Sequence, residues 1–157
     1  MEHEWYRALG KMVYGIYVLT TAHGKEQNGM IASWVTQVSH QPPLILAAVH
    51  PSRYSHSLIR QSGGFALHVI AKEQKALLAQ FKGPDPAAKF SDLAWHKGKT
   101  GSPILQDCIA YLDCEVKESL APGNHTLFIG QVIDGRLVAE GQVLDTGDYD
   151  GAYTGKS

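Results

Sequence analysis

Two long segments near the C-terminal end constrain the fold more than any other feature of the sequence. Residues 104–120 and residues 126–139 are each predicted to form a strand. The segment between them begins with the sequence Ala-Pro-Gly-Asn at residues 121–124, which is typical of a turn. We therefore expect a long hairpin of two antiparallel strands, with Gly135 interrupting the second strand as a tight turn.

The remainder of the chain adds shorter strands and a few helices. Strands are expected at residues 13–21, 30–39, 44–49 and 65–70, and helices at residues 2–12, 51–61 and 72–81. Strands and helices do not alternate regularly, which argues against a doubly wound parallel sheet. The expected fold is mainly β: an antiparallel barrel of six or seven strands with short peripheral helices, since closing the sheet removes exposed edges.

Composition indicates one domain followed by a short tail. The chain has 157 residues, of which 44% are hydrophobic, enough to build one core without disulfides. From Gly141 onward, glycine alternates with aspartate and apolar residues become rare. We expect a domain over residues 1–140 and a tail over residues 141–157 that is frayed or orders only on a partner.

Charge and apolar content exclude several kinds of partner. The chain carries 14 basic and 15 acidic residues with no basic run, so no nucleic-acid partner is expected. No apolar stretch reaches the length of a membrane span, and the N-terminus does not resemble a secretory signal, so the cytoplasm is the expected compartment.

The cysteines and histidines do not form a metal-binding pattern. Cys108 and Cys114 lie six residues apart on one predicted strand, about 20 Å apart if extended, which is too far for a disulfide. We expect both to be buried thiols. The eight histidines do not share a convincing helix face, and no HExxH motif is present, so no metal site is expected.

The sequence lacks the standard nucleotide-phosphate loops and the serine-hydrolase elbow, but four segments contain unusual polar residues. Residues 27–36 place glycine and small residues in an apolar strand, where a ligand could approach the backbone; a β-bulge or plain turn is the alternative. Residues 50–57 end a strand and begin a helix with Arg53, Ser55 and His56, an arrangement that suits a phosphate; an ordinary Ser-capped helix is the alternative.

The other two segments have weaker signals. Residues 81–90 contain lysines that could reach a phosphate and Phe81, which could cover a ring; a solvated loop is the alternative. His125 follows a Gly-Asn turn and begins a strand, where it could donate a hydrogen bond to a ligand. An exposed hairpin histidine is the alternative there.

Taken together and in this order, several motifs resemble the flavin reductase-like family, whose fold is the FMN-binding split barrel. The resemblance covers roughly residues 6–138. It is carried by GIYVLTT at 15–21, NGMIASWVTQVS at 28–39, PPL at 42–44, YSH at 54–56 with Leu58-Ile59, Gly64-Phe65, and GNHTLFIGQV at 123–132.

The resemblance implies a homodimer that binds FMN, or FAD, near the subunit interface. It implies that one stretch lines the flavin ring and ribityl chain largely through its backbone: Asn28, Gly29, Met30, Ile31, Ala32, Ser33, Trp34, Val35 and Thr36. The phosphate would contact the segment Ser52, Arg53, Tyr54, Ser55 and His56, and the loop containing Phe81 and Lys89 would add further contacts.

The resemblance also implies a reaction. The bound flavin would take hydride from NAD(P)H and pass electrons to free flavin, a metalloprotein or ferric iron, with no obligatory catalytic side chain and with His125 near the nicotinamide or flavin edge. Trp34 departs from the family pattern and would stack on the flavin or narrow the nicotinamide path.

Two alternatives share the expected fold. One is an FMN electron carrier that exchanges electrons with a redox protein partner, within a larger system, and reacts poorly with nicotinamide. The other is a pyridoxamine-phosphate-oxidase-like or haem-binding barrel, for which the sequence singles out no axial ligand.

Overall fold

A computed structural model of the chain describes residues 1–148. The strands are β1 (Tyr17–His23), β2 (Glu26–Ala32), β3 (Val35–Ser39), β4 (Leu44–Val49), β5 (Gly64–Val69), β6 (Trp95–Lys97), β7 (Pro103–Leu105), β8 (Ala110–Leu120) and β9 (Thr126–Leu137). The helices are α1 (Glu4–Leu9), α2 (Tyr54–Ser62) and α3 (Leu77–Lys82), with short 3-10 turns η1 (Lys72–Gln74), η2 (Ala88–Phe90) and η3 (Thr146–Asp148).

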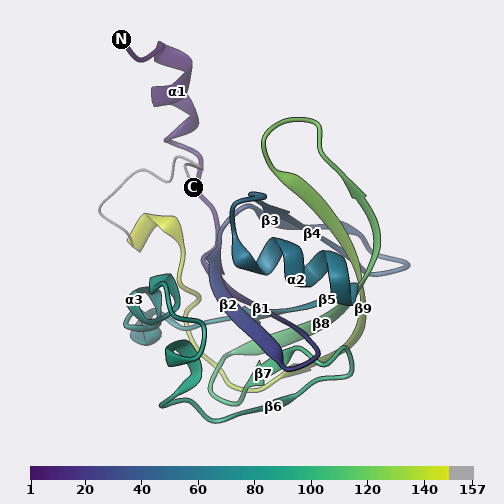
Figure 1. The fold of residues 1–157 in the computed structure, drawn as a ribbon. Coiled ribbons are helices and arrows are strands. Elements are labelled where there is room, and N and C mark those ends of the chain that lie inside the picture. Colours follow the sequence, from purple (N-terminus) through teal and green to yellow (C-terminus); the bar gives the residue numbers. More distant parts are fainter. Residues whose placement is uncertain (149–157) are drawn as a thin grey trace.

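Seven strands form one antiparallel sheet that curls around α2 (Figure 1). Their order is β2-β1-β5-β8-β9-β4-β3, and every neighbouring pair is antiparallel. The expectation of a mainly β barrel with short peripheral helices is confirmed. The long hairpin is β8 and β9, but Gly135 does not interrupt β9, because it stays in register opposite Leu112.

The expected strand over residues 30–39 is in fact two strands at opposite edges of the sheet. Strand β2 ends at Ala32 and β3 begins at Val35, so the chain bends at Ser33 and Trp34. At the bend, Trp34 O accepts a hydrogen bond from Ala48 N at 3.0 Å. The bend takes the chain from one edge of the sheet to the other. Closure of the barrel requires such a bend, but no local sequence pattern predicts it.

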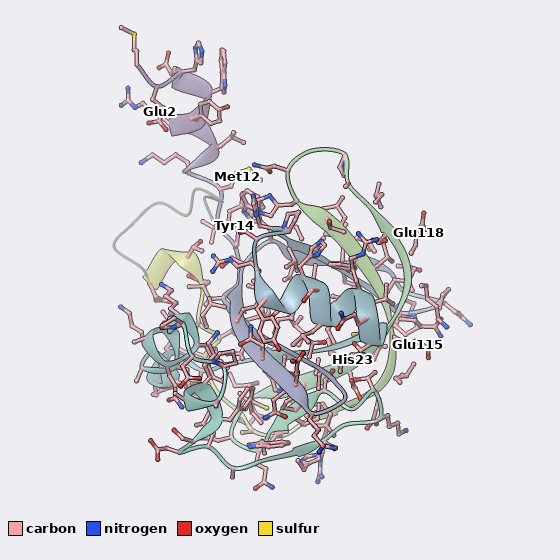
Figure 2. The ribbon with its side chains drawn as sticks, viewed as in Figure 1. Glu2, Met12, Tyr14, His23, Glu115 and Glu118 are labelled. Atoms are coloured by element: carbon pink, nitrogen blue, oxygen red, sulfur yellow. The ribbon has the colours of Figure 1, made fainter. Side chains whose placement is uncertain are left out.

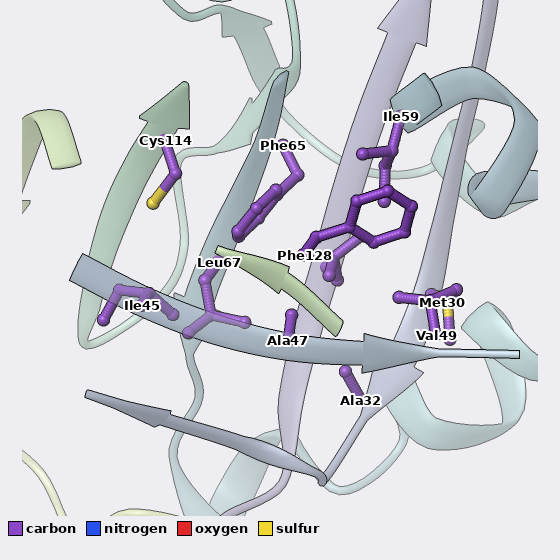
Figure 3. Close-up of a cluster of buried hydrophobic side chains, with 11 residues drawn as sticks. Met30, Ala32, Ile45, Ala47, Val49, Ile59, Phe65, Leu67, Cys114 and Phe128 are labelled. Atoms are coloured by element: carbon purple, nitrogen blue, oxygen red, sulfur yellow. The ribbon is translucent and has the colours of Figure 1, made fainter. Parts of the chain in front are cut away.

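The barrel interior is filled by apolar side chains from the strands and α2 (Figure 3). The cluster consists of Leu19, Met30, Ala32, Ile45, Ala47, Val49, Ile59, Phe65, Leu67, Cys114 and Phe128. Side chains alternate along each strand, so Leu19 points inside whereas its neighbour Val18 belongs to a second core. One face of α2 covers this interior, and Gly63 ends the helix with a φ of 74°, as the sequence predicts.

The second core lies outside the barrel, where α3 and the following loop cover β1 and β2. It contains Ile16, Val18, Ile70, Leu77, Leu78, Phe81, Phe90, Leu105 and Leu144. Leu144 is only 1% exposed, and its N–H donates to Ile70 O at 3.0 Å. Residues 142–148 of the expected tail are therefore packed on the domain and not frayed, while residues 149–157 lie outside the described part.

Three other expected boundaries are wrong. The predicted strand at 104–120 is divided into β7, which pairs with β6, and β8, so Cys108 does not share a strand with Cys114. The predicted helix at 72–81 is a 3-10 turn followed by α3. The strand expected from residue 13 begins only at Tyr17. Both cysteines are nevertheless free and buried, as expected.

Helix α1 stands away from the barrel at the end of an N-terminal arm (Figure 1). It buries none of its residues, and the side chains of Trp5, Tyr6, Leu9 and Met12 are each more than half exposed. The expected helix over residues 2–12 is therefore shorter. Among residues 1–148, no helix is long and apolar enough to span a membrane.

Candidate functional site

Three segments that are far apart in the sequence meet at the first turn of α2. Asn28 Nδ2, on β2, donates to Ser55 Oγ at 2.9 Å. Lys89 Nζ donates to Asn28 Oδ1 at 3.0 Å and to the carbonyl oxygen of Gly29 at 2.8 Å. The side chains of Asn28, Ser55 and Lys89 are buried. The structure thus brings together three residues that the sequence predicted for a phosphate or flavin site.

The ammonium of Lys89 is held only by neutral oxygens in the described part of the chain. No carboxylate among residues 1–148 lies within ion-pair distance of it. Burial, followed by the positive charge of Arg53, lowers the pKa of Lys89. A buried cation normally pairs with an anion, and repulsion from a second cation nearby makes an anionic partner still more favourable. A negatively charged group would therefore be stabilised beside this cluster.

The helix contributes to the same field. The first turn of a helix has N–H groups without intrahelical acceptors and carries the positive end of the helix dipole. In α2, the N-cap residue is Arg53, whose side chain makes no capping bond, and not Ser52 or Ser55 as the sequence suggested. Ser52 instead bonds His50, with its Oγ 2.9 Å from His50 Nδ1.

A second cluster is aromatic and lies around Trp34, at the bend between β2 and β3. The ring of His125 contacts the indole of Trp34, with centroids 4.8 Å apart, and His50 meets His125 edge-on at 5.2 Å. Tyr14, where the N-terminal arm joins the barrel (Figure 2), lies 6.4 Å from Trp34 between centroids. All four side chains are half-buried.

Electrostatics link the two clusters. Burial, and then the charges of His50 and Arg53, lower the pKa of His125. Arg53 therefore acts on both Lys89 and His125. The consequence is a neutral imidazole in neutral solution, able to donate one hydrogen bond and accept another.

His56 lies between the two clusters and bonds on the aromatic side. Its Nε2 is 2.7 Å from Thr126 Oγ1, and its ring packs edge-on against Phe128 with centroids 5.3 Å apart. Burial, then the charges of Arg60 and His50, lower the pKa of His56. No hydrogen bond joins His56 to Lys89 among the described residues.

Two other residues of the predicted flavin site, Phe81 and Gly29, pack against each other. Phe81 is 1% exposed and sits in the second core; its Cε1 lies only 2.4 Å from where a Cβ on Gly29 would be. The structure thus gives Gly29 a reason other than close approach of a ligand: the ring of Phe81 occupies the space.

The other residues predicted to contact the flavin differ in where their side chains point. Met30 and Ala32 point into the barrel interior with Val35 packed beside them, while Ile31 packs against the second core. Ser33 is buried, whereas Thr36 and Tyr54 are exposed. Contacts of Met30, Ala32 and Ser33 with a ligand would therefore involve mainly their backbone.

Three residues of the site were not in the predicted set. His50 and Tyr14 complete the aromatic cluster, and Thr126 bonds His56. The signal for His50 was its position at the end of a strand, directly before the predicted phosphate segment. Tyr14 carries no local signal, because its contact with Trp34 depends on how the arm enters the barrel.

Comparison with known proteins agrees with this fold. The family model described as "Flavin reductase like domain" matches residues 9–156. The ferric-chelate reductase (NAD(P)H) of Archaeoglobus fulgidus is 28% identical over 154 residues, which cover 96% of this chain and 91% of that protein. The diflavin flavoprotein A 1 of Synechocystis sp. is 33% identical over 139 residues, covering 86% of this chain.

The similarity extends to solved structures. The NADH:FAD oxidoreductase SgcE6 of Streptomyces globisporus, in complex with NAD and FAD fragments, superposes with a TM-score of 0.82 at 27% identity, covering 90% of this chain and 86% of that one. The chain spans only 24% of the length of the diflavin flavoprotein. Because the family model covers nearly the whole sequence, this chain belongs to the flavin reductase-like domain family.

Proposed function

We propose that the chain binds FMN, with the phosphate held by Lys89, Arg53 and the first turn of α2. The observation that carries this proposal is the buried ammonium of Lys89, which has no anionic partner among the described residues. A phosphate monoester is a dianion with three acceptor oxygens, so it satisfies two cations and helix N–H groups together. In the pyrophosphate of FAD each phosphorus carries one negative charge and two non-bridging oxygens, so FAD matches this set of donors less well.

The bound flavin supplies the redox chemistry: hydride acceptance and the passing on of electrons. The residues of this chain bind and orient it. The backbone of residues 28–36 and the bend at Trp34 lead from the phosphate end to the aromatic cluster, which leaves His125 to contact the flavin edge or a nicotinamide. Its neutral imidazole can hold a hydrogen bond there without adding a charge.

NAD(P)H is the proposed hydride donor. Two similar proteins support it by their names, the ferric-chelate reductase (NAD(P)H) and the NADH:FAD oxidoreductase. The proposed acceptors are free flavin, ferric iron or a metalloprotein.

One observation favours an electron carrier as the second candidate. The indole of Trp34 lies against His125, so a nicotinamide reaching His125 has to share this space with a large ring. The diflavin flavoprotein is about four times longer than this chain, which supports a system in which electrons arrive from another domain or protein.

A homodimer is the proposed assembly, and α1 supports it. A six-residue helix is too short to be stable alone in water, yet its exposed apolar side chains include Trp5 and Leu9. Sedimentation equilibrium of the full chain should give about twice the 17.1 kDa mass. A Trp5→Glu variant should shift the population to monomer, and a monomeric wild-type protein would contradict the proposal.

An anaerobic titration separates reductase from carrier. The protein is saturated with FMN, its visible flavin absorbance is recorded, and NADH or NADPH is added in separate experiments. Rapid bleaching by either nucleotide supports the reductase. Bleaching only by dithionite supports the carrier, and failure to retain FMN contradicts both.

A further inference from the structure

Two adjacent side chains in the first turn of α2 bond to opposite sides of the candidate site. Ser55 Oγ accepts from Asn28 Nδ2, on the phosphate side, whereas His56 Nε2 pairs with Thr126 Oγ1, on the side of the aromatic cluster. Both Ser55 and His56 are buried. The backbone of one helical turn therefore connects the cationic cluster to the first residue of β9.

Thr126 directly follows His125 and can restrict its orientation. Residues 121–124 are exposed, and Thr126 is the first residue of β9, where it pairs with Val49. His125 is thus the single residue between an exposed turn and the sheet. A hydrogen bond from the side chain of Thr126 restricts the backbone where it leaves the turn. It therefore also restricts the direction in which the ring of the preceding residue, His125, can point.

We propose that His56 is a positioning residue for His125: its bond to Thr126 fixes the start of β9, so that the ring of His125 stays against Trp34. The ring of His56 is itself held by Phe128, with centroids 5.3 Å apart. The role of His125 toward nicotinamide rests on the proposed function; the geometric link does not.

This assignment differs from a phosphate contact, which the family resemblance implied for His56. A histidine that contacts the phosphate should direct a ring nitrogen toward Lys89 and Arg53. The Nε2 of His56 instead bonds Thr126, which belongs to a different strand from Asn28. The lowered pKa of His56 agrees, because a neutral imidazole suits a hydroxyl better than a phosphate. The two roles differ in their effect on FMN affinity: loss of a positioning residue leaves it nearly unchanged, whereas loss of a phosphate contact weakens it.

The first test uses the full chain without any ligand. Histidine is labelled with 13C, and the ring signal of His125 is assigned by its loss in His125→Gln. Thr126→Val and His56→Leu should each shift and broaden that signal. The control is Thr21→Val. It removes the buried hydroxyl of a threonine on β1, which donates to Gly64 O at 2.8 Å. An unchanged His125 signal in Thr126→Val overturns the proposal.

The second test separates positioning from binding. In Thr126→Val and His56→Leu, the dissociation constant of FMN should stay within about twofold, while the rate of reduction at subsaturating NAD(P)H falls about tenfold. His56→Gln, whose amide can still reach the hydroxyl, should recover most of the rate. In a His125→Gln background, Thr126→Val should cause no further loss, since its effect passes through His125.

The outcomes separate the two proposals. If His56→Leu weakens FMN far more than riboflavin, His56 contacts phosphate and the positioning role is wrong. If wild-type protein is not reduced by either nicotinamide, the reductase function is wrong, and the ligand-free spectra still decide whether His56 positions His125.

Discussion

Lys89 Nζ lies 3.0 Å from Asn28 Oδ1, and 61 positions separate the two residues in the sequence. The amide of Asn28 uses its oxygen to accept from Lys89 and its nitrogen to donate to Ser55. One buried side chain thus aligns a cation from η2 with the first turn of α2. This relay defines the cationic end of the site before any ligand binds.

Replacing Asn28 by alanine should destabilise the protein. The change removes one acceptor from a buried ammonium and one donor from a buried hydroxyl, which should cost about 2–4 kcal/mol in the free energy of unfolding. Urea denaturation measures this. Gln37→Ala is the control, since that exposed amide bonds only Ser39 O nearby, and its effect should be below about 0.5 kcal/mol. Equal effects in the two variants would contradict the relay.

Gly29→Ala should destabilise through overpacking. An added Cβ would lie 2.4 Å from Phe81 Cε1, and Phe81 is fully buried, so the cost should be about 1–3 kcal/mol. Adding Phe81→Leu should recover part of the loss, which a double-mutant cycle by thermal or urea unfolding will show. Gly83→Ala is the control, because its φ is −64° and its nearest contact would be 3.8 Å away. Additive effects of the two changes would argue against the contact.

His68 should make the stability depend on pH. Its Nδ1 donates to Val18 O and its Nε2 accepts from Leu105 N, and burial lowers its pKa from 6.5 to about 4. Above pH 6.5 the ring is neutral in both states and its stabilising effect is complete. As the pH falls from about 6.5 to 4, the unfolded chain takes up the proton first, and about 3 kcal/mol is lost.

Urea titrations at several pH values measure this loss. His68→Gln should flatten the profile in that range, whereas His23→Gln, an exposed residue at the opposite end of β1 from the aromatic cluster (Figure 2), should leave it unchanged. A wild-type profile that is flat from pH 6.5 to 4 would show that His68 is protonated in the folded protein.

Both thiols should be unreactive in the folded protein. Burial, followed by the nearby carboxylates of Asp107 and Asp113, raises the pKa of Cys108 to about 11 and of Cys114 to about 12. At pH 8 their reaction with a disulfide reagent such as DTNB should be at least about 100-fold slower than that of a free thiol. Unfolding in urea should release two reactive thiols. Rapid modification without urea would mean that the barrel opens.

Local sequence patterns were sufficient for much of the barrel. Strand β4 has the predicted bounds, and the ends of β5, α2 and β9 differ from prediction by about three residues or fewer, because each has its own hydrophobic pattern and stop signals. The bend at Trp34 was not predictable in this way. Residues 30–39 look continuous as a strand, and only the need to join the two sheet edges divides them.

The candidate site shows the same division. Ser55 stood out in a helix-starting segment and the lysines of residues 81–90 in a loop, whereas Asn28 was named through the resemblance to the flavin reductase-like family. The sequence suggested that Phe81 could cover a ligand ring, but it gave no sign that Phe81 packs on Gly29. No local pattern relates His56 to Thr126 either, since the two residues are 70 positions apart. Long-range pairings of this kind are set by the sheet order, which the sequence does not display.

The most direct test compares FMN with riboflavin, which lacks the phosphate, in wild type and Lys89→Met. Methionine keeps an unbranched apolar stem of similar length but removes the charge. Fluorescence titration should show the dissociation constant of FMN rising about 100-fold, while that of riboflavin stays within about threefold. If Lys89→Met weakens both ligands equally, or neither, then the buried ammonium does not hold the phosphate and the account of this site is wrong.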